Sequence, residues 1–183
     1  MPDVVPARPE RVFTIGHSTR PIDDFIGLLV GAGVHAIADV RRFPGSRHHP
    51  EYGREALAAT LAVHGLGYRW LPELGGRRRP RPDSPNTAWR NEAFRGYADH
   101  MASDEFRTGY AHLLEFTAAQ PTAILCAEAV WWRCHRGLIS DRLVVDGIPV
   151  FHILGAGKAA AHVLKPPARV VDGRLTYAAE GVE

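Results

Sequence analysis

The sequence predicts an α/β fold, a three-layer domain with a mainly parallel sheet of about five strands and helices on both faces. Two observations predict it. Short apolar runs alternate with longer segments in which apolar residues recur at helical spacing, and glycines close those segments. The length of 183 residues and the hydrophobic content of 45% suit a single core. We therefore expect residues 1–183 to form one domain.

The first half of the chain follows a β-α-β-α-β rhythm. The expected strands are short apolar runs at residues 12–15, 36–40 and 68–71. Ser18 or Thr19 can cap the first helix, with Pro21 in its first turn. Leu57 and Leu61 mark the second helix. Strands joined through helices in this way are parallel and have right-handed crossovers.

A basic segment at residues 75–89 interrupts the rhythm with prolines and arginines, so we expect an exposed, mobile loop that orders as a lid when an anion binds. Further along, the pattern predicts helices over 91–101, from Ser103 and from about His135, and strands over 122–126 and 148–154. Residues 155–183 are expected to be a C-terminal extension with a small hairpin at Asp172-Gly173.

Composition narrows the function classes. The formal charge of +2 is too balanced to indicate nucleic acid by itself. Two cysteines do not make the disulfide framework of a secreted protein, and residues 1–12 do not read as a signal peptide. No stretch approaches the roughly 20 apolar residues that cross a bilayer. We expect a cytoplasmic protein with reduced thiols and no membrane contact.

Polar residues follow the end of every expected strand. In open α/β sheets, ligands bind beyond the carboxyl ends of the strands. The catalytic candidates there are Cys134, Cys126, Glu128, His17 and His135. The substrate-binding candidates are Ser18, Thr19, Asp39, Arg41, Ser46, Glu73, Arg136 and His152. Structural roles stay open for several of them. Ser18 and Thr19 can be helix caps, Cys126 can be a small buried packing residue, and His152 can be a hydrogen-bonded residue of the pocket wall.

Cys134-His135-Arg136, at a predicted helix start, is the most specific functional motif of the sequence. Helix amides and a fixed positive charge both favour a thiolate, so we expect Cys134 to be more acidic and more reactive than Cys126. A partly buried structural thiol remains the alternative. Seven residues separate the two cysteines, which allows the sulfurs to meet without requiring it.

The sequence lacks the motifs of several known catalytic, metal-binding and nucleotide-binding sites. A tyrosine-phosphatase loop needs Arg six positions after the cysteine, and Ser140 stands there. Cys126 and Arg133 enclose six residues without a glycine, which argues against a glycine-rich amide cradle. The sequence has no paired C-x-x-C, no G-x-G-x-x-G after the first strand and no P-loop. It therefore predicts no metal site and names no cofactor.

Seven motifs stand in order along the chain: IGHST at 15–19, Asp39-Val40-Arg41, LPELGG at 71–76, FRGYA at 94–98, Cys126 with Glu128, Cys134-His135-Arg136, and VFHI at 150–153. Together they resemble the bacterial and archaeal "domain of unknown function 488" family over about residues 12–154. The resemblance implies an α/β fold with its site at the paired-cysteine segment, and it implies no reaction. The residues between the cysteines depart from the family pattern, which is polar and includes a proline, because residues 129–133 read AVWWR.

Two classes of function follow. In the first, an enzyme holds a small phosphate- or nucleotide-like anion with Arg41, Arg136 and helix amides. Cys134 or Cys126 is then its nucleophile or redox thiol, and His17, Glu128 or His135 moves protons. The alternative is a non-catalytic metal or anion sensor, or a nucleic-acid-binding protein. Nucleic acid would be held by the arginines of the basic segment, Arg77, Arg78, Arg79 and Arg81.

Overall fold

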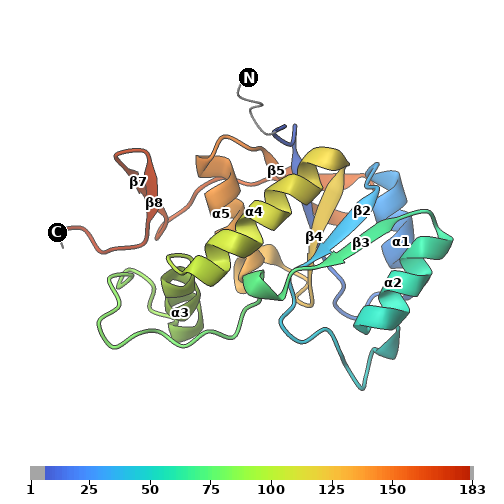
Figure 1. The fold of residues 1–183 in the computed structure, drawn as a ribbon, viewed down its shortest axis with the longest axis horizontal. Coiled ribbons are helices and arrows are strands. Elements are labelled where there is room, and N and C mark those ends of the chain that lie inside the picture. Colours follow the sequence, from blue (N-terminus) through green and yellow to red (C-terminus); the bar gives the residue numbers. More distant parts are fainter. Residues whose placement is uncertain (1–6, 182–183) are drawn as a thin grey trace, which may run out of the picture.

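A six-stranded sheet runs through the centre of the molecule (Figure 1). This computed structural model describes residues 7–181. The strand order is β3-β2-β4-β1-β5-β6. The strands are β1 (Val12–Gly16), β2 (Ala36–Asp39), β3 (Gly67–Trp70), β4 (Thr122–Cys126), β5 (Val150–Gly155) and β6 (Lys158–Ala161). The first five are parallel, and only β6 pairs antiparallel to its neighbour. The predicted fold class is confirmed.

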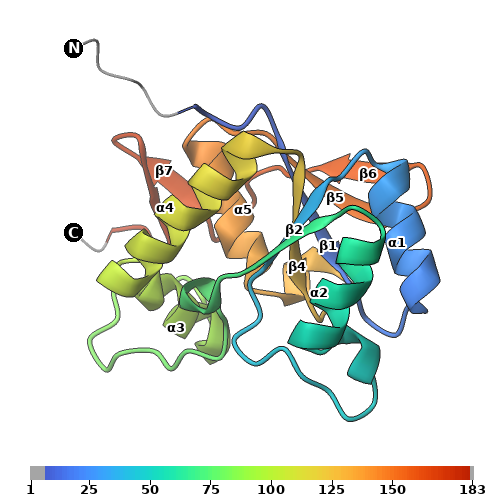
Figure 2. The same cartoon turned by 45° about the vertical axis from the view of Figure 1, so that its right-hand side comes forward.

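Helices cover both faces of this sheet (Figure 2). They are α1 (Ile22–Gly31), α2 (Arg54–Val63), α3 (Glu92–His100), α4 (Asp104–Ala119) and α5 (Arg136–Val145), with short 3-10 turns η1 (Pro50–Tyr52), η2 (Pro72–Leu74) and η3 (Trp131–Arg133). Neighbouring residues of a strand point to opposite faces, so Ile37 packs with α1 and α2 while Ala38 packs with α3, α4 and α5. None of the helices within residues 7–181 has the length and apolar character needed to span a membrane.

The helix starts agree only partly with the prediction. Ser103 caps α4 through its hydroxyl, as expected, and Asn91 caps α3. Neither Ser18 nor Thr19 caps α1, which begins after Pro21 without a side-chain cap. The reason is local: Ser18 has a φ of 48°, and the chain makes an extra turn there before the helix begins. The capping prediction was therefore wrong for α1.

The C-terminal extension adds one strand to the main sheet and forms a hairpin. The hairpin consists of β7 (Arg169–Val171) and β8 (Arg174–Thr176). Asp172 and Gly173 form its turn with φ values of 49° and 73°, the left-handed pair that a tight hairpin requires. The predicted hairpin is confirmed. β6 was missed because its run of alanines carries little strand preference.

The basic segment 75–89 is fastened to α3 and α4. Asp99 accepts hydrogen bonds from the Ser84 hydroxyl at 2.6 Å, the Asn86 amide at 2.8 Å and the Arg81 backbone at 2.8 Å. Arg78 forms a two-pronged ion pair with Glu105. Burial alone would raise the pKa of Asp99, but these hydrogen bonds outweigh burial and lower it. The segment is largely exposed, as expected, and these contacts anchor it to α3 and α4. Its mobility and its ordering over an anion stay predictions.

Candidate functional site

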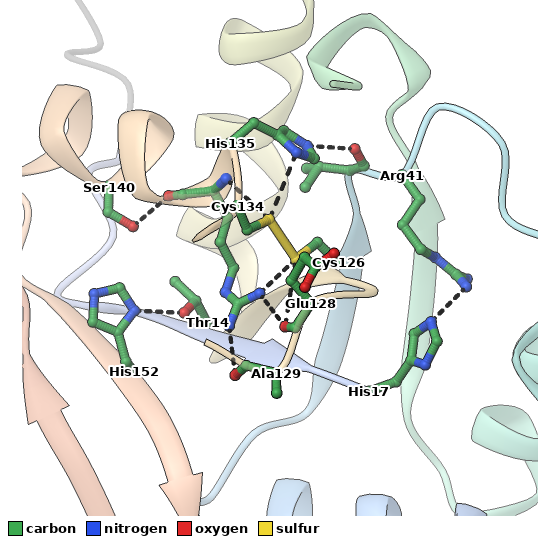
Figure 3. Close-up of a disulfide and its surroundings, with 12 residues drawn as sticks. Thr14, His17, Arg41, Cys126, Glu128, Ala129, Cys134, His135, Ser140 and His152 are labelled. Atoms are coloured by element: carbon green, nitrogen blue, oxygen red, sulfur yellow. Dashed lines mark hydrogen bonds between the residues drawn. A yellow bond between two sulfur atoms is a disulfide. The ribbon is translucent and has the colours of Figure 1, made fainter. Parts of the chain in front are cut away.

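The parallel register brings the ends of three neighbouring strands to one edge of the sheet. Gly16 at the end of β1 stands opposite Cys126 at the end of β4, and Asp39 at the end of β2 stands opposite Leu125. The segments that follow these strands therefore leave the sheet side by side. Figure 3 shows the side chains gathered there, with His17 and Arg41 on one side and the two cysteines near the centre.

A cavity of about 370 Å³ opens at this edge. We call it the arginine pocket, because Arg41, Arg42, Arg77 and Arg133 line it together with Phe94, Cys126, Glu128, Cys134 and His135. These lining residues include four arginines and one glutamate, and one of the arginines, Arg41, is paired with the buried Asp39. Clefts lined by one sign of charge concentrate ions of the opposite sign, and guanidinium forks suit phosphate and carboxylate oxygens. The lining of the pocket therefore carries an excess of positive charge.

The two cysteines meet on the wall of this pocket. The structure joins Cys126 and Cys134 in a disulfide, with Cα atoms 7.5 Å apart (Figure 3). The chain leaves β4, turns through η3 and returns at the start of α5, which brings the second sulfur back to the first. The sequence prediction of reduced thiols differs from this arrangement. Cys134 is 5% exposed and Cys126 is 1% exposed.

Arg136 lies beneath the cysteines instead of in the pocket. Its side chain is 1% exposed. The guanidinium donates to the sulfur of Cys126, to the Glu128 carbonyl at 2.7 Å and to the Ala129 carbonyl at 3.2 Å. Its Nε has no partner among the described residues. The guanidinium thus holds the loop after β4 and does not line the arginine pocket, where the sequence analysis expected it.

Arg136 is a buried cation that has no carboxylate partner among the described residues. No carboxylate in residues 7–181 lies within ion-pair distance of it. Burial lowers the pKa of Arg136 to about 10. A buried cation is stabilised by a nearby anion, and the sulfur of Cys126 is the contacting group that can become one in the reduced protein. The guanidinium thus supports a thiolate on Cys126, whereas the sequence analysis assigned that support to Cys134.

Cys134 has a different neighbour, the imidazole of His135. Nε2 of His135 lies 2.9 Å from the Val40 carbonyl and donates to it, which leaves Nδ1 as an acceptor 3.6 Å from the Cys134 sulfur (Figure 3). Burial lowers the pKa of His135 to about 4, so the ring is neutral near pH 7. The backbone N–H of Arg136 also donates to the Cys134 sulfur, at 3.4 Å. The helix start and a proton acceptor therefore both face this thiol.

Asp39 positions Arg41 and does not face the pocket. Its fully buried carboxylate accepts from Arg41 Nε at 2.9 Å, from Arg41 Nη2 at 2.7 Å and from the Tyr68 hydroxyl at 2.6 Å. Arg41 Nη1 lies 3.4 Å from Nε2 of His17, which stacks on Tyr52. Burial lowers the pKa of His17, which keeps the ring neutral near pH 7. His17 therefore lies beside the Arg41 guanidinium and does not line the pocket.

Other predicted residues lie away from the pocket or contribute differently. Ser46 accepts two backbone N–H groups of its own exposed turn. Glu73 lies on η2 with one carboxylate oxygen buried and unpaired among the described residues. Thr19 is exposed, and neither it nor Ser18 lines the pocket. Glu128 does line the pocket with an exposed side chain, while its carbonyl accepts from the buried guanidinium.

His152 belongs to a buried polar chain behind the cysteines. It lies 2.6 Å from the Thr14 hydroxyl and 2.8 Å from His162, which lies 2.6 Å from Asp141. The Tyr177 hydroxyl donates to the second oxygen of Asp141 at 2.7 Å. Burial lowers the pKa of His152 to about 3. His152 is thus a hydrogen-bonded interior residue that does not line the arginine pocket. Nothing in the sequence pointed to the other members of this hydrogen-bonded chain.

The sequence analysis did not assign three arginines of the pocket wall to the site: Arg42, Arg77 and Arg133. Arg42 and Arg133 each stand next to a residue that was singled out, so adjacency was the only available signal. Arg77 was noticed only as part of the basic segment. Their convergence depends on how three separate loops fold over the sheet edge, and spacing along the chain does not contain that information.

Neither the curated proteins nor the solved structures gave a match to the chain. One family model, described as "Domain of unknown function DUF488", matches residues 21–143. The matched part contains Arg41, both cysteines and Arg136, and it ends within α5. The match covers more than half of the chain, and the protein therefore belongs to the DUF488 family.

Proposed function

We propose that this protein is a thiol enzyme that binds a small anionic, phosphate-bearing substrate in the arginine pocket and acts on it through Cys126 and Cys134. The observation that carries the proposal is the position of both sulfurs on the wall of a cavity lined by four arginines. A convergent pocket of charged and nucleophilic groups is the usual signature of a catalytic site.

Arg133 is the arginine of the pocket best placed to reach an anion, because the guanidinium of Arg41 is already paired with the buried Asp39 and lies beside His17. Arg133 is exposed and stands directly before Cys134, where it can draw an anion toward the sulfur.

The two thiols of the reduced protein have distinct parts in this proposal. Cys134 is the more exposed one, and the Arg136 backbone N–H at the helix start stabilises its thiolate once the proton has gone to solvent. This thiolate attacks one sulfur of a disulfide in the substrate. The new bond is a mixed disulfide, and the substrate's other sulfur leaves as a thiolate. The Cys126 thiolate, held by Arg136, then attacks the Cys134 sulfur and releases the remaining substrate fragment as a thiolate. The substrate gains two electrons, the protein ends as the disulfide in Figure 3, and an external dithiol must reduce it.

Protection of the thiol by an anion tests this function. The reduced protein is treated with limiting iodoacetamide, with and without inorganic phosphate, and Cys134 labelling is followed by peptide mass spectrometry. We expect phosphate to slow the labelling in the wild type. Arg133→Gln should weaken that protection by about fivefold, because a charge-assisted hydrogen bond at an exposed position contributes roughly 1 kcal/mol.

Arg107→Gln is the matched control, since Arg107 is an exposed arginine of α4 whose contacts are local. It should behave as the wild type. If phosphate leaves the Cys134 labelling rate unchanged at every concentration in the wild-type protein, the anion pocket does not exist and the proposal is wrong.

A nucleic-acid-binding function is the second candidate, supported by one specific contact. The Phe43 ring is 64% exposed on the rim of the arginine pocket, with Arg42 at 5.5 Å and Arg77 at 5.9 Å from its centre. Exposed aromatic rings flanked by arginines are typical of single-strand binding. A mobility-shift assay with single-stranded oligonucleotides tests it. For the metal-sensor alternative, residues 7–181 contain no group of three or more His, Cys, Asp or Glu side chains placed to hold a metal ion.

A further inference from the structure

A second cavity, of about 260 Å³, adjoins the arginine pocket. We call it the tryptophan pocket, because Trp89, Trp131 and Trp132 line it together with Phe94 and Cys134. Phe94 and Cys134 line both cavities. The proposed attacking sulfur therefore stands where an anion-binding cavity meets an aromatic one.

The aromatic rings of this pocket leave one face open for stacking. One face of Trp131 is covered by His152, whose ring lies parallel at a centroid distance of 4.5 Å. Trp132 stands perpendicular to Trp131 at 5.7 Å and is 56% exposed. Large exposed apolar side chains at the rim of a cavity are typical of ligand-binding surfaces. Trp132 is thus the ring available to a ligand.

The remaining wall of the pocket is fixed and carries no free carboxylate. Both oxygens of Asp141 already accept hydrogen bonds, one from His162 and one from Tyr177. His162 is held in turn by His152. These bonds fix the wall against which a ligand would pack, so little ordering entropy opposes binding. The apolar part of the lining is mainly aromatic, which suits a flat ring better than an aliphatic chain.

We infer that the substrate is a nucleotide-like molecule that carries the disulfide attacked by Cys134, with a planar heteroaromatic base stacked on Trp132 in the tryptophan pocket and its phosphate in the arginine pocket. The inference rests on the proposed function and deepens it. The two cavities meet at Cys134, so a ligand that fills both passes directly over the sulfur. Stacking and charge then act together, because each cavity binds a different part of one molecule.

Binding to the reduced full-length protein tests the inference. Calorimetry compares adenosine 5′-monophosphate with ribose 5-phosphate, which lacks the base, and with inorganic phosphate. We expect the nucleotide to bind on the order of tenfold more tightly than ribose 5-phosphate, the usual contribution of one stacked base. Three of the four tryptophans line the pocket, so the nucleotide should also quench the intrinsic fluorescence.

Two exposed aromatic residues give a matched pair of variants. Trp132→Ala should abolish the preference for the nucleotide over ribose 5-phosphate, and Trp132→Phe should retain most of it because a ring remains. Phe43→Ala removes a comparably exposed ring from the rim of the arginine pocket and should leave the preference unchanged. Melting temperatures of all three variants should match the wild type, since both side chains are exposed.

The outcomes separate this inference from the proposed function. If phosphate binds and protects Cys134 but the nucleotide gains nothing over ribose 5-phosphate, the inference is wrong and the anion site stands. If Phe43→Ala, and not Trp132→Ala, removes the preference, the base lies outside the tryptophan pocket and the inference is likewise overturned. If no phosphate-bearing ligand binds, the proposed function fails first and the inference fails with it.

Discussion

Acidification from pH 7 to pH 5 should destabilise this protein by several kcal/mol through two buried histidines. Burial lowers the pKa of His135 to about 4 and that of His152 to about 3, whereas the ordinary value is 6.5. A group with a depressed folded-state pKa binds protons first in the unfolded chain. Its contribution to stability is therefore complete above pH 6.5 and is lost as the pH falls toward the folded-state value.

The size of the effect follows from these values. At pH 5 an unfolded imidazole lies about 1.5 pH units below its pKa, and each unit corresponds to about 1.36 kcal/mol. Each of the two histidines therefore costs about 2 kcal/mol of unfolding free energy at pH 5, or about 4 kcal/mol together. His17 and His100 change the stability in the same direction, because burial lowers their pKa values too.

Urea unfolding followed by circular dichroism at the two pH values measures this change. Carboxyl groups of the unfolded chain titrate near pH 4, so they contribute little between pH 7 and pH 5. His135→Gln should remove about 2 kcal/mol of the pH dependence, and His64→Gln, at an exposed position, should remove none. An unfolding free energy that changes by less than about 1 kcal/mol between the two pH values in the wild type would refute the reasoning.

Three further predictions concern the site and its supports. In the reduced protein, limiting iodoacetamide should label Cys134 before Cys126, because Cys134 is more exposed and faces an acceptor nitrogen; peptide mass spectrometry showing the opposite order would contradict this. Gly16→Ala should destabilise the fold by more than about 2 kcal/mol in chemical denaturation, because the added methyl overlaps the backbone of the loop after β4. Gly27→Ala, in open space on α1, should stabilise slightly by comparison, and equal effects would argue against the close approach. Asp99→Ala should speed hydrogen exchange within residues 81–86, and unchanged exchange would mean that the segment is held by other contacts.

The fold could be predicted well because buried strands are recognisable in the sequence as short apolar runs. The apolar run 122–126 gave β4 with its observed bounds, and the Asp172-Gly173 pair gave the hairpin turn. The capping prediction for α1 failed because a capping residue needs the right backbone geometry, and Ser18 adopts a left-handed turn instead. The capping preferences of residue types indicate which residues can cap a helix, but they do not determine at which residue the helix begins.

The candidate site was located more accurately than its contacts. Both cysteines and Arg41 do line the pocket, because strand ends of a parallel sheet share one edge. The direction of the Arg136 side chain could not be predicted, since it depends on how α5 is rotated against the loop after β4. For the same reason the sequence placed Arg136 with the wrong cysteine.

The C-terminal extension contributes to the tryptophan pocket from outside the matched family region. The family match ends at residue 143, whereas His162 and Lys165 line that pocket and Tyr177 holds its Asp141. The three tryptophans of that pocket lie inside the matched region with the cysteines, so the tail completes only one wall of it. A different tail joined after residue 154 would therefore replace His162 and Lys165 in this wall while leaving the three tryptophans and both cysteines in place, so one side of the pocket can vary independently of the rest.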